Sequence, residues 1–242
     1  MLKQLTLAAA IASALTASLV QAETVSTAAG DFDVSMNASL TTNYVWRGVS
    51  QTRNNGAIQG GLDVAHDSGL YVGAWGSNVD FDTEAAVEFD YYVGFAGDIT
   101  EDFSYDLGYN TYTYPDESGL NFAEYYGSVS GYGFTLGANY SNDFTGFGSN
   151  DSTLYTYIGY EYSLPMDIGL ALQYGNYDFK DDLSVGGDDS YNDWSVGLTK
   201  ELAGLEFGLT YTDTNLSGAD QAFFGKNDFS DANVTLSVSK SL

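Results

Sequence analysis

Seven charged residues occupy positions from which strands of alternating polarity would turn them toward one shared interior. They are Arg47, Asp63, Glu88, Asp90, Asp106, Glu124 and Glu161. Clustered carboxylates attract cations, and one arginine among them would narrow an interior passage or reverse the local field. The arginine could equally serve the structure, because it would neutralise buried carboxylates that repel one another. Both roles stay open for Arg47.

Two other groups could carry chemistry. His66 is the only histidine and the only candidate base for a hydrolase. It precedes Asp67-Ser68, and we expect an exposed turn there, without an oriented nucleophile. The carboxylate run Asp181, Asp182, Asp188 and Asp189, with Asn192 and Asp193 beyond it, offers oxygen ligands for calcium. Their spacing matches no calcium-binding loop, so we interpret them as a solvated loop. We therefore predict no catalytic residues, no metal site and no cofactor.

The composition limits the kind of protein. A formal net charge of −26 excludes ordinary nucleic-acid binding, which needs basic residues to neutralise phosphates. The chain has no cysteine, and it has 28 glycines, 20 tyrosines and 14 phenylalanines with only 2 prolines. Many aromatic residues and few prolines are typical of strands joined by turns. The composition thus favours an all-β protein whose charge suits cations.

The N-terminus has the pattern of a secretory signal peptide. A basic start at Met1-Leu2-Lys3 precedes an apolar run from Leu5 to Val20, and Val20-Gln21-Ala22 offers small residues for cleavage. We predict a signal peptide over residues 1–22 and one domain over residues 23–242. Because no later segment is apolar enough for a membrane helix, a membrane-spanning mature chain would have to cross as strands.

Alternation of apolar and polar residues recurs along the mature chain. Val87, Phe89, Tyr91 and Val93, for example, alternate with Glu88 and Asp90. The alternation predicts twelve strands, at 34–47, 56–66, 69–79, 85–97, 102–114, 121–131, 133–142, 153–163, 167–178, 190–200, 204–212 and 231–242. Residues 23–32 are predicted to be a flexible leader. The connections alternate between long and short, which is the pattern of outer-membrane barrels.

Strand number decides which face would point inward. A barrel of this size with its apolar face inside would enclose a large dry void, whereas a polar interior can hold water. We therefore predict a transmembrane, antiparallel, up-and-down β-barrel of about twelve strands. Aromatic residues near the strand ends would form two girdles at the membrane interfaces, with aromatic core filler as the alternative. The long-loop girdle comprises Tyr44, Trp46, Tyr112, Tyr114, Tyr155, Tyr157, Tyr174, Tyr177, Tyr191 and Trp194, and the short-turn girdle Phe95, Phe103, Phe134, Tyr160 and Tyr162.

Three stretches resemble a known family. Residues 44–52 read Tyr-Val-Trp-Arg-Gly-Val-Ser-Gln-Thr, and they are followed by Ala57–Asp63 and Gly69–Phe81. Together they resemble the TorF-like porin family of Gram-negative outer membranes, densely over residues 38–81 and more loosely beyond. The resemblance implies a one-domain outer-membrane barrel that acts as a porin, and it assigns Arg47 no established role. The chain departs from the usual barrel pattern by ending on Leu242 instead of an aromatic residue.

Two functions follow as hypotheses. The first is a porin-like channel in the outer membrane for passive diffusion of small hydrophilic solutes, with cations favoured and the seven charged residues lining the pore. Its partners would be outer-membrane lipid and small hydrophilic solutes or cations, with no nucleic acid; the oligomeric state stays open. The alternative is a non-conducting barrel that acts as a structural anchor or as an adhesin through its extracellular loops. Loops that fold inward and plug the lumen would favour this alternative.

Overall fold

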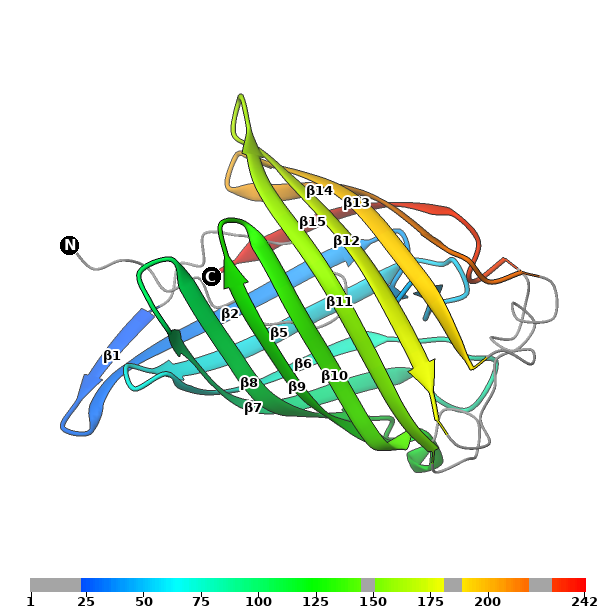
Figure 1. The fold of residues 1–242 in the computed structure, drawn as a ribbon, viewed down its shortest axis with the longest axis horizontal. Helices are drawn as coiled ribbons and strands as arrows, with labels where there is room; N and C mark the ends of the chain where they lie inside the picture. Colours follow the sequence, from blue (N-terminus) through cyan, green and yellow to red (C-terminus); the bar gives the residue numbers. More distant parts are fainter. Residues whose placement is uncertain (1–22, 145–150, 181–188, 218–227) are drawn as a thin grey trace.

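The computed structural model describes residues 23–144, 151–180, 189–217 and 228–242. Within these ranges twelve antiparallel strands form a closed barrel in sequence order, and β2 closes it by pairing with both β5 and β15 (Figure 1). The strands are β2 (Gly30–Thr41), β5 (Ala57–His66), β6 (Leu70–Asn78), β7 (Val87–Asp98), β8 (Phe103–Thr113), β9 (Phe122–Gly131), β10 (Phe134–Phe144), β11 (Asp151–Leu164), β12 (Ile168–Phe179), β13 (Ser190–Leu202), β14 (Leu205–Thr214) and β15 (Asn233–Ser241). The predicted fold class is confirmed. The predicted signal peptide lies outside the described residues.

The first predicted strand is wrong at both ends. It was expected over residues 34–47, but β2 spans Gly30–Thr41 and the chain then leaves the barrel wall. The predicted flexible leader is also wrong, because β1 (Glu23–Thr27) pairs with the start of β2. Leu242 exchanges two backbone hydrogen bonds with Met36, and Glu23 pairs with Val34 on the same edge of β2. β1 therefore continues the β2 edge where β15 ends, and so satisfies backbone groups that would otherwise be unpaired.

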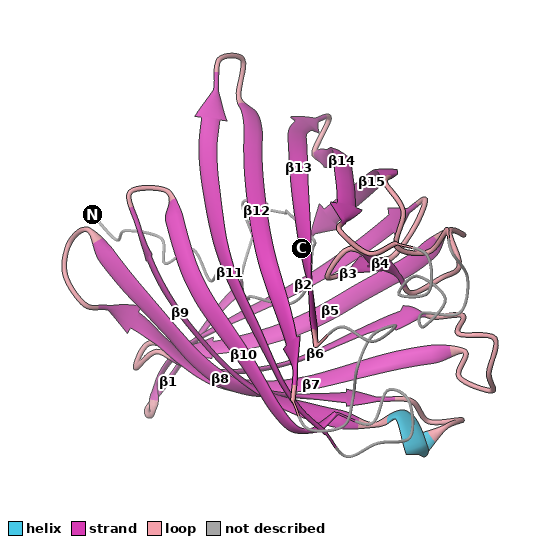
Figure 2. Ribbon diagram, turned by 45° about the vertical axis from the view of Figure 1, so that its right-hand side comes forward, coloured by secondary structure: helices cyan, strands magenta, loops and turns pink. Residues whose placement is uncertain are grey.

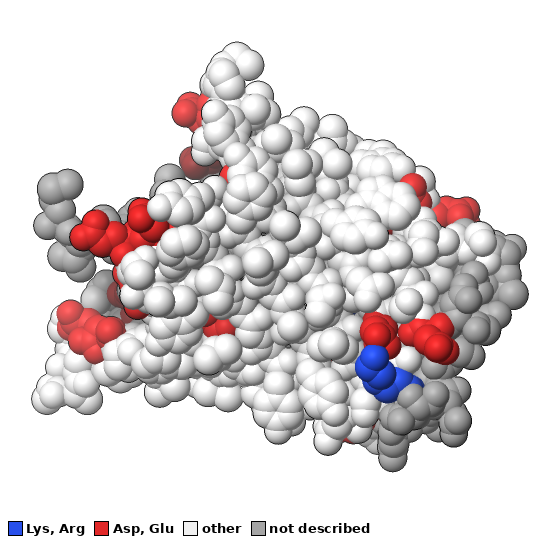
Figure 3. Space-filling view, in the orientation of Figure 1, with Lys and Arg blue, Asp and Glu red and all other residues white. Residues whose placement is uncertain are grey.

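The outer surface of the barrel is an apolar belt. Figure 3 shows acidic side chains gathered toward the two ends of one face, with few charged side chains between them. Exposed apolar residues on this outer surface include Met36, Leu40, Ile58, Leu62, Val72, Phe89, Val93, Leu107, Val129, Leu136, Ile158, Leu172, Val196, Leu209 and Leu236. An apolar area of this extent is stable against lipid and unstable against water. The strands therefore cross a membrane.

The two rims of the barrel differ. At one rim the connections are as short as two residues: Tyr132-Gly133 and Ala203-Gly204 both have positive φ, which suits the tight turns that match strand twist. The opposite rim carries the longer connections, together with the short helix η1 (Ser118–Leu120) drawn in Figure 2. In outer-membrane barrels the short turns face the periplasm and the long loops face outward. No helix in the described ranges is long and apolar enough to span a membrane.

The predicted aromatic girdles are correct at one rim and mostly wrong at the other. At the short-turn rim Phe95, Phe103, Phe134 and Tyr162 are exposed on the outer surface. At the long-loop rim the buried aromatic residues Tyr44, Tyr112, Tyr114, Tyr155, Tyr177 and Tyr191 fill the lumen instead of facing lipid. Their strands explain the difference, because Tyr112 shares the parity of the buried Asn110 while Leu107 on the other face is exposed. The core-filler alternative therefore describes these residues.

Candidate functional site

A short hairpin lies inside the barrel near the long-loop rim. Residues 42–56, which we call the inner hairpin, leave the wall after Thr41 and contain strands β3 (Val45–Trp46) and β4 (Val49–Ser50), labelled in Figure 2. Arg47 and Gly48 form its two-residue turn, with φ values of 48° and 80°. Gly48 is required there, since a Cβ atom would lie 2.4 Å from Thr214 Cγ2 and 2.9 Å from Asp193 Cβ. The prediction that Arg47 sits on a wall strand is therefore wrong.

Polar side chains hold the inner hairpin in its folded form. The Oδ1 atom of Asn43 accepts hydrogen bonds from Ser50 Oγ at 2.6 Å and from Thr52 Oγ1 at 3.0 Å. Backbone bonds then tie the hairpin to other segments, from the Ser50 N–H to the Phe229 carbonyl and from the Asp80 N–H to the Gln51 carbonyl. The hairpin is thus anchored at several points, as expected for a fixed part of the lumen.

Arg47 is the centre of the site. Its guanidinium donates two hydrogen bonds to the Glu124 carboxylate, at 2.9 and 2.8 Å, and the two side chains are 5% and 0% exposed. The same group lies 4.3 Å from the ring centroid of Tyr155 and 4.6 Å from that of Tyr177. A planar guanidinium suits both the paired bonds and the ring faces, which an ammonium group cannot reproduce. Arg47 is the only buried basic residue in the described part of the chain.

Aromatic side chains surround this ion pair and exclude water. Trp46 packs edge-on against Tyr112 and Tyr177, with ring centroids 5.9 and 5.8 Å apart. The Tyr191 hydroxyl donates to the Arg47 carbonyl at 2.9 Å. The buried cluster comprises Tyr44, Val49, Ala57, Val79, Ala85, Tyr112, Tyr114, Phe122, Phe144, Tyr155, Tyr177, Phe179, Tyr191 and Leu216. We call the inner hairpin and this cluster the plug.

Three further carboxylates are buried in the plug. Glu88 accepts hydrogen bonds from the Tyr44 hydroxyl at 2.7 Å and from the Tyr114 hydroxyl at 2.5 Å. Asp90 is 0% exposed and Asp193 is 3% exposed; within the described residues one carboxylate oxygen of each has no hydrogen-bond partner. Asp193 was interpreted as part of a solvated loop, which is wrong, because it lies on β13 and faces the lumen. Asp181, Asp182 and Asp188 lie outside the described residues.

Asp63 and Asp106 belong to a second layer, in which carboxylates are held by tyrosines. The Tyr71 hydroxyl donates to Asp106 at 2.5 Å and lies 2.6 Å from the Tyr126 hydroxyl. The Tyr92 hydroxyl donates to Asp63. Tyrosine hydroxyls therefore satisfy these carboxylates in place of basic residues.

The seven predicted residues thus divide into three groups. Arg47, Glu88, Asp90 and Glu124 meet in the plug, Asp63 and Asp106 lie in the tyrosine layer, and Glu161 is exposed on β11 close to the short-turn rim. Sequence reasoning missed the tyrosines that hold these carboxylates. The parity of their strands was the available signal, since Tyr112 and Tyr114 alternate in step with Asn110.

Glycines opposite tyrosines allow this packing. A Cβ atom on Gly94 would lie 2.3 Å from the Tyr71 ring, and one on Gly108 would lie 2.3 Å from the Tyr126 ring. Each pair faces across neighbouring strands, so the ring lies flat over a position without a side chain. Gly73 and Gly137 have the same relation to Tyr92 and Tyr157. Glycine at these positions is thus a packing requirement.

Gly94→Ala is expected to destabilise the barrel by about 1–3 kcal/mol, because the added methyl group forces Tyr71 away from Asp106. The urea midpoint of unfolding in detergent measures this effect. Gly119→Ala is the matched control, since a Cβ atom there would meet nothing within 4 Å. Equal midpoints for the two variants would contradict the packing requirement.

The ring nitrogens of His66 both contact polar neighbours, which the sequence did not predict. It ends β5 at an exposed turn as predicted, but its Nδ1 lies 2.7 Å from Ser68 Oγ and its Nε2 lies 3.2 Å from Asp67 Oδ1. The Nε2 atom also lies 2.9 Å from the Ala29 carbonyl, which accepts its proton. Ser68 Oγ in turn accepts from the Leu70 N–H at 3.4 Å. These contacts join two adjacent turns, and we interpret them as turn stabilisation.

A family model covers nearly all of the chain after its first 24 residues. It matches residues 25–242 and describes a bacterial protein of unknown function, Gcw_chp. The chain belongs to the Gcw_chp family. The family description does not mention TorF-like porins, so the resemblance to that family stays a prediction. A search of curated proteins finds no match to the Gcw_chp chain.

Solved structures of porins share the fold. The NanC porin superposes with a TM-score of 0.54 at 11% identity, covering 85% of this chain and 97% of its own. The KdgM porin superposes with a TM-score of 0.52 at 11% identity, covering 86% and 97%. The Gcw_chp chain therefore has the barrel fold of outer-membrane porins, and its apolar belt is consistent with residence in that membrane.

Proposed function

We propose that this Gcw_chp barrel is an outer-membrane channel for small hydrophilic solutes, with the plug as its constriction and with cations favoured. The observation that supports this most is the charge of the plug. In the plug, one basic residue, Arg47, lies among four buried carboxylates, those of Glu88, Asp90, Glu124 and Asp193. After Arg47 has paired with Glu124, the other three carboxylates have no basic partner among the described residues, and an acidic constriction favours cations.

The other half of the lumen supports a hydrated passage. Toward the short-turn rim the inward positions of β13, β14 and β15 carry small or polar residues, among them Thr199, Gly208 and Ser237. Exposed Glu161 adds a carboxylate on that side. Such a lining can hold water, whereas the plug narrows the lumen at the opposite end. Solute entry would then depend on how closely the inner hairpin packs.

One observation favours the alternative of a non-conducting barrel. Tyr177 and Tyr191 are each 1% exposed and Glu124 is 0% exposed, so water does not reach the centre of the plug. A plug that never moves would leave the barrel as an anchor or as an adhesin acting through its extracellular loops. A measurement of ion conductance through the reconstituted barrel distinguishes a channel from a non-conducting anchor or adhesin.

Reconstitution of residues 23–242 into a planar bilayer under a salt gradient tests the proposal. We expect discrete conductance steps and a reversal potential that favours cations. Asp193→Asn should weaken the cation preference because it removes a plug carboxylate, and Asp98→Asn is the control, since Asp98 is exposed at the end of β7. Folded protein that gives no steps would contradict the channel and favour the anchor. An unchanged reversal potential in Asp193→Asn would contradict the role given to the plug charges.

A further inference from the structure

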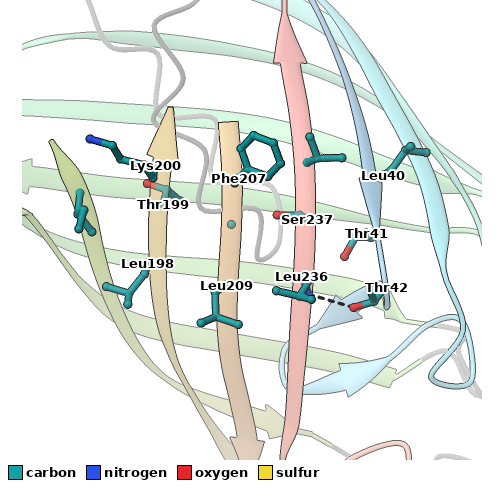
Figure 4. Close-up of a pocket in the computed structure, with 13 residues that line it drawn as sticks. Leu40, Thr41, Thr42, Leu198, Thr199, Lys200, Phe207, Leu209, Leu236 and Ser237 are labelled. Carbon is teal, nitrogen blue, oxygen red and sulfur yellow. Dashed lines mark hydrogen bonds between the residues drawn. The ribbon is translucent and has the colours of Figure 1, made fainter. Parts of the chain in front are cut away.

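An apolar groove lies on the lipid-facing side of the barrel wall. It has a volume of about 630 Å³ and is lined by residues of β2, β12, β13, β14 and β15 together with Thr42 (Figure 4). Leu198 pairs with Leu209 and Leu209 pairs with Leu236, so the three side chains form one row across three strands. All three are exposed, which places them on the outer surface. The groove is thus within the belt that contacts lipid.

The groove lies beside the point where the chain leaves the barrel wall and enters the inner hairpin. Thr42 Oγ1 accepts a hydrogen bond from the Leu236 N–H at 3.0 Å, and the chain then leaves the wall as the inner hairpin (Figure 4). A second row, nearer the short-turn rim, places Phe207 beside Val238 and Val238 beside Leu40. Two rows of large apolar residues therefore line an open depression that runs toward the short turns.

Two lysines lie at the short-turn end of this depression. Lys200 pairs with Phe207 and therefore shares the outer face, and its ammonium group donates to the Met166 carbonyl and lies 4.0 Å from Asp167. Lys240 follows Val238 on the same face of β15. Its Nζ atom reaches the β13–β14 turn, 3.6 Å from the position of a Cβ atom on Gly204. The whole chain has only 7 basic residues against 33 acidic ones, so two ammonium groups at one end of an apolar groove form a distinct chemical feature.

We propose that this groove binds one anionic phospholipid of the periplasmic leaflet. Its acyl chain would lie along the two apolar rows, and Lys200 and Lys240 would bind the phosphate at the membrane surface. The short turns face the periplasm, so the lysines stand at the head-group level of that leaflet. Basic side chains beside an apolar surface attract anionic lipid, and each contributes a several-fold gain in binding.

The test measures retained lipid. The barrel of residues 23–242 is reconstituted in vesicles that contain equal amounts of phosphatidylcholine and phosphatidylglycerol, and it is then extracted into mild detergent. Native mass spectrometry measures the mass of the barrel with its bound lipid. We expect one phosphatidylglycerol bound per chain in preference to phosphatidylcholine. The double variant K200Q/K240Q should lower the bound fraction by roughly tenfold or more. Lys180→Gln is the matched control, because Lys180 pairs with Asp178 near the opposite rim.

A second variant tests the apolar part of the site. Leu209→Trp enlarges a side chain that already faces lipid, so it should fill the groove without disturbing the lumen, and it should also reduce lipid retention. Heat-modified migration in gels confirms that each variant is folded. Equal retention in K200Q/K240Q and wild type would overturn the proposal, as would equal retention of the two lipids. A mass of two chains without bound lipid would assign the groove to self-association instead.

Discussion

Arg47→Ala is expected to raise the conductance of the barrel severalfold and to strengthen its preference for cations. The substitution leaves Glu124 buried without its partner, and removing one member of a buried ion pair costs about 3–5 kcal/mol. It also removes the group that lies against the Tyr155 and Tyr177 rings. The inner hairpin would then pack less tightly, and the net negative charge of the lumen would increase.

Two controls separate this effect from a general loss of stability. Arg53 lies in the same hairpin but is bonded to exposed Asp82 at 2.7 Å, an interaction that raises the pKa of the Arg53 guanidinium. Because exposed ion pairs contribute little, Arg53→Gln should leave conductance unchanged. Arg47→Lys keeps the charge but loses the paired bonds, so it should lie between wild type and Arg47→Ala.

Single-channel recording in planar bilayers measures all three variants. Identical conductance and selectivity in wild type and Arg47→Ala would leave Arg47 no role in the passage. Loss of folding in Arg47→Ala, detected by heat-modified migration, would show instead that the plug stabilises the whole barrel. In that case Arg47→Lys remains the variant by which conductance is judged.

Val196→Arg is expected to destabilise the barrel by about 2–4 kcal/mol, because it places a charge on the lipid-facing side near the middle of β13. The cross-strand neighbours of Val196 are Leu172 and Tyr211, which are also exposed on the outer surface. No water reaches this depth of a bilayer to solvate a guanidinium, so the side chain must bend toward the interface.

Ser195→Arg is the matched control, one residue away on the opposite face. Ser195 pairs with Gln173 and Thr212 and shares the parity of lumen-facing Asp193. A guanidinium there meets polar groups and a carboxylate, so we expect a change in stability below about 1 kcal/mol. The free energy of unfolding in lipid vesicles, measured by urea titration, compares the two. A larger loss for Ser195→Arg would mean that the barrel faces are reversed.

The strands and their faces were predictable from the sequence because alternation is a local property. Each residue of a strand points opposite to its neighbours, so a run such as residues 87–97 fixes its own inner and outer faces without reference to the rest of the chain. Eleven of the predicted strands agree with the structure to within a few residues, and only the first was displaced. Loop length likewise distinguished the two rims.

The inner hairpin was not predictable in this way. Residues 42–47 continue the alternation of β2 in outline, and nothing in their local pattern indicates that the chain leaves the wall after Thr41. What turns them inward is distant in sequence: Glu124 is 77 residues from Arg47, and the Tyr191 hydroxyl that bonds the Arg47 carbonyl is 144 residues away. Strand parity already places Tyr155, Tyr177 and Tyr191 on the lumen side, but their contacts with Arg47 were not predictable, because they join residues far apart in the sequence.

The sequence by itself thus determined a polar, acidic lumen inside an apolar barrel, since each of these properties is written into neighbouring residues. The sequence also predicted that Arg47 points inward, but only the tertiary structure decided that it lies on a turn with positive φ instead of a wall strand, paired with one carboxylate and enclosed by tyrosines. The physical reason is that burial and charge pairing depend on which strands meet across the lumen. Barrel closure brings those strands together, and no local pattern records it.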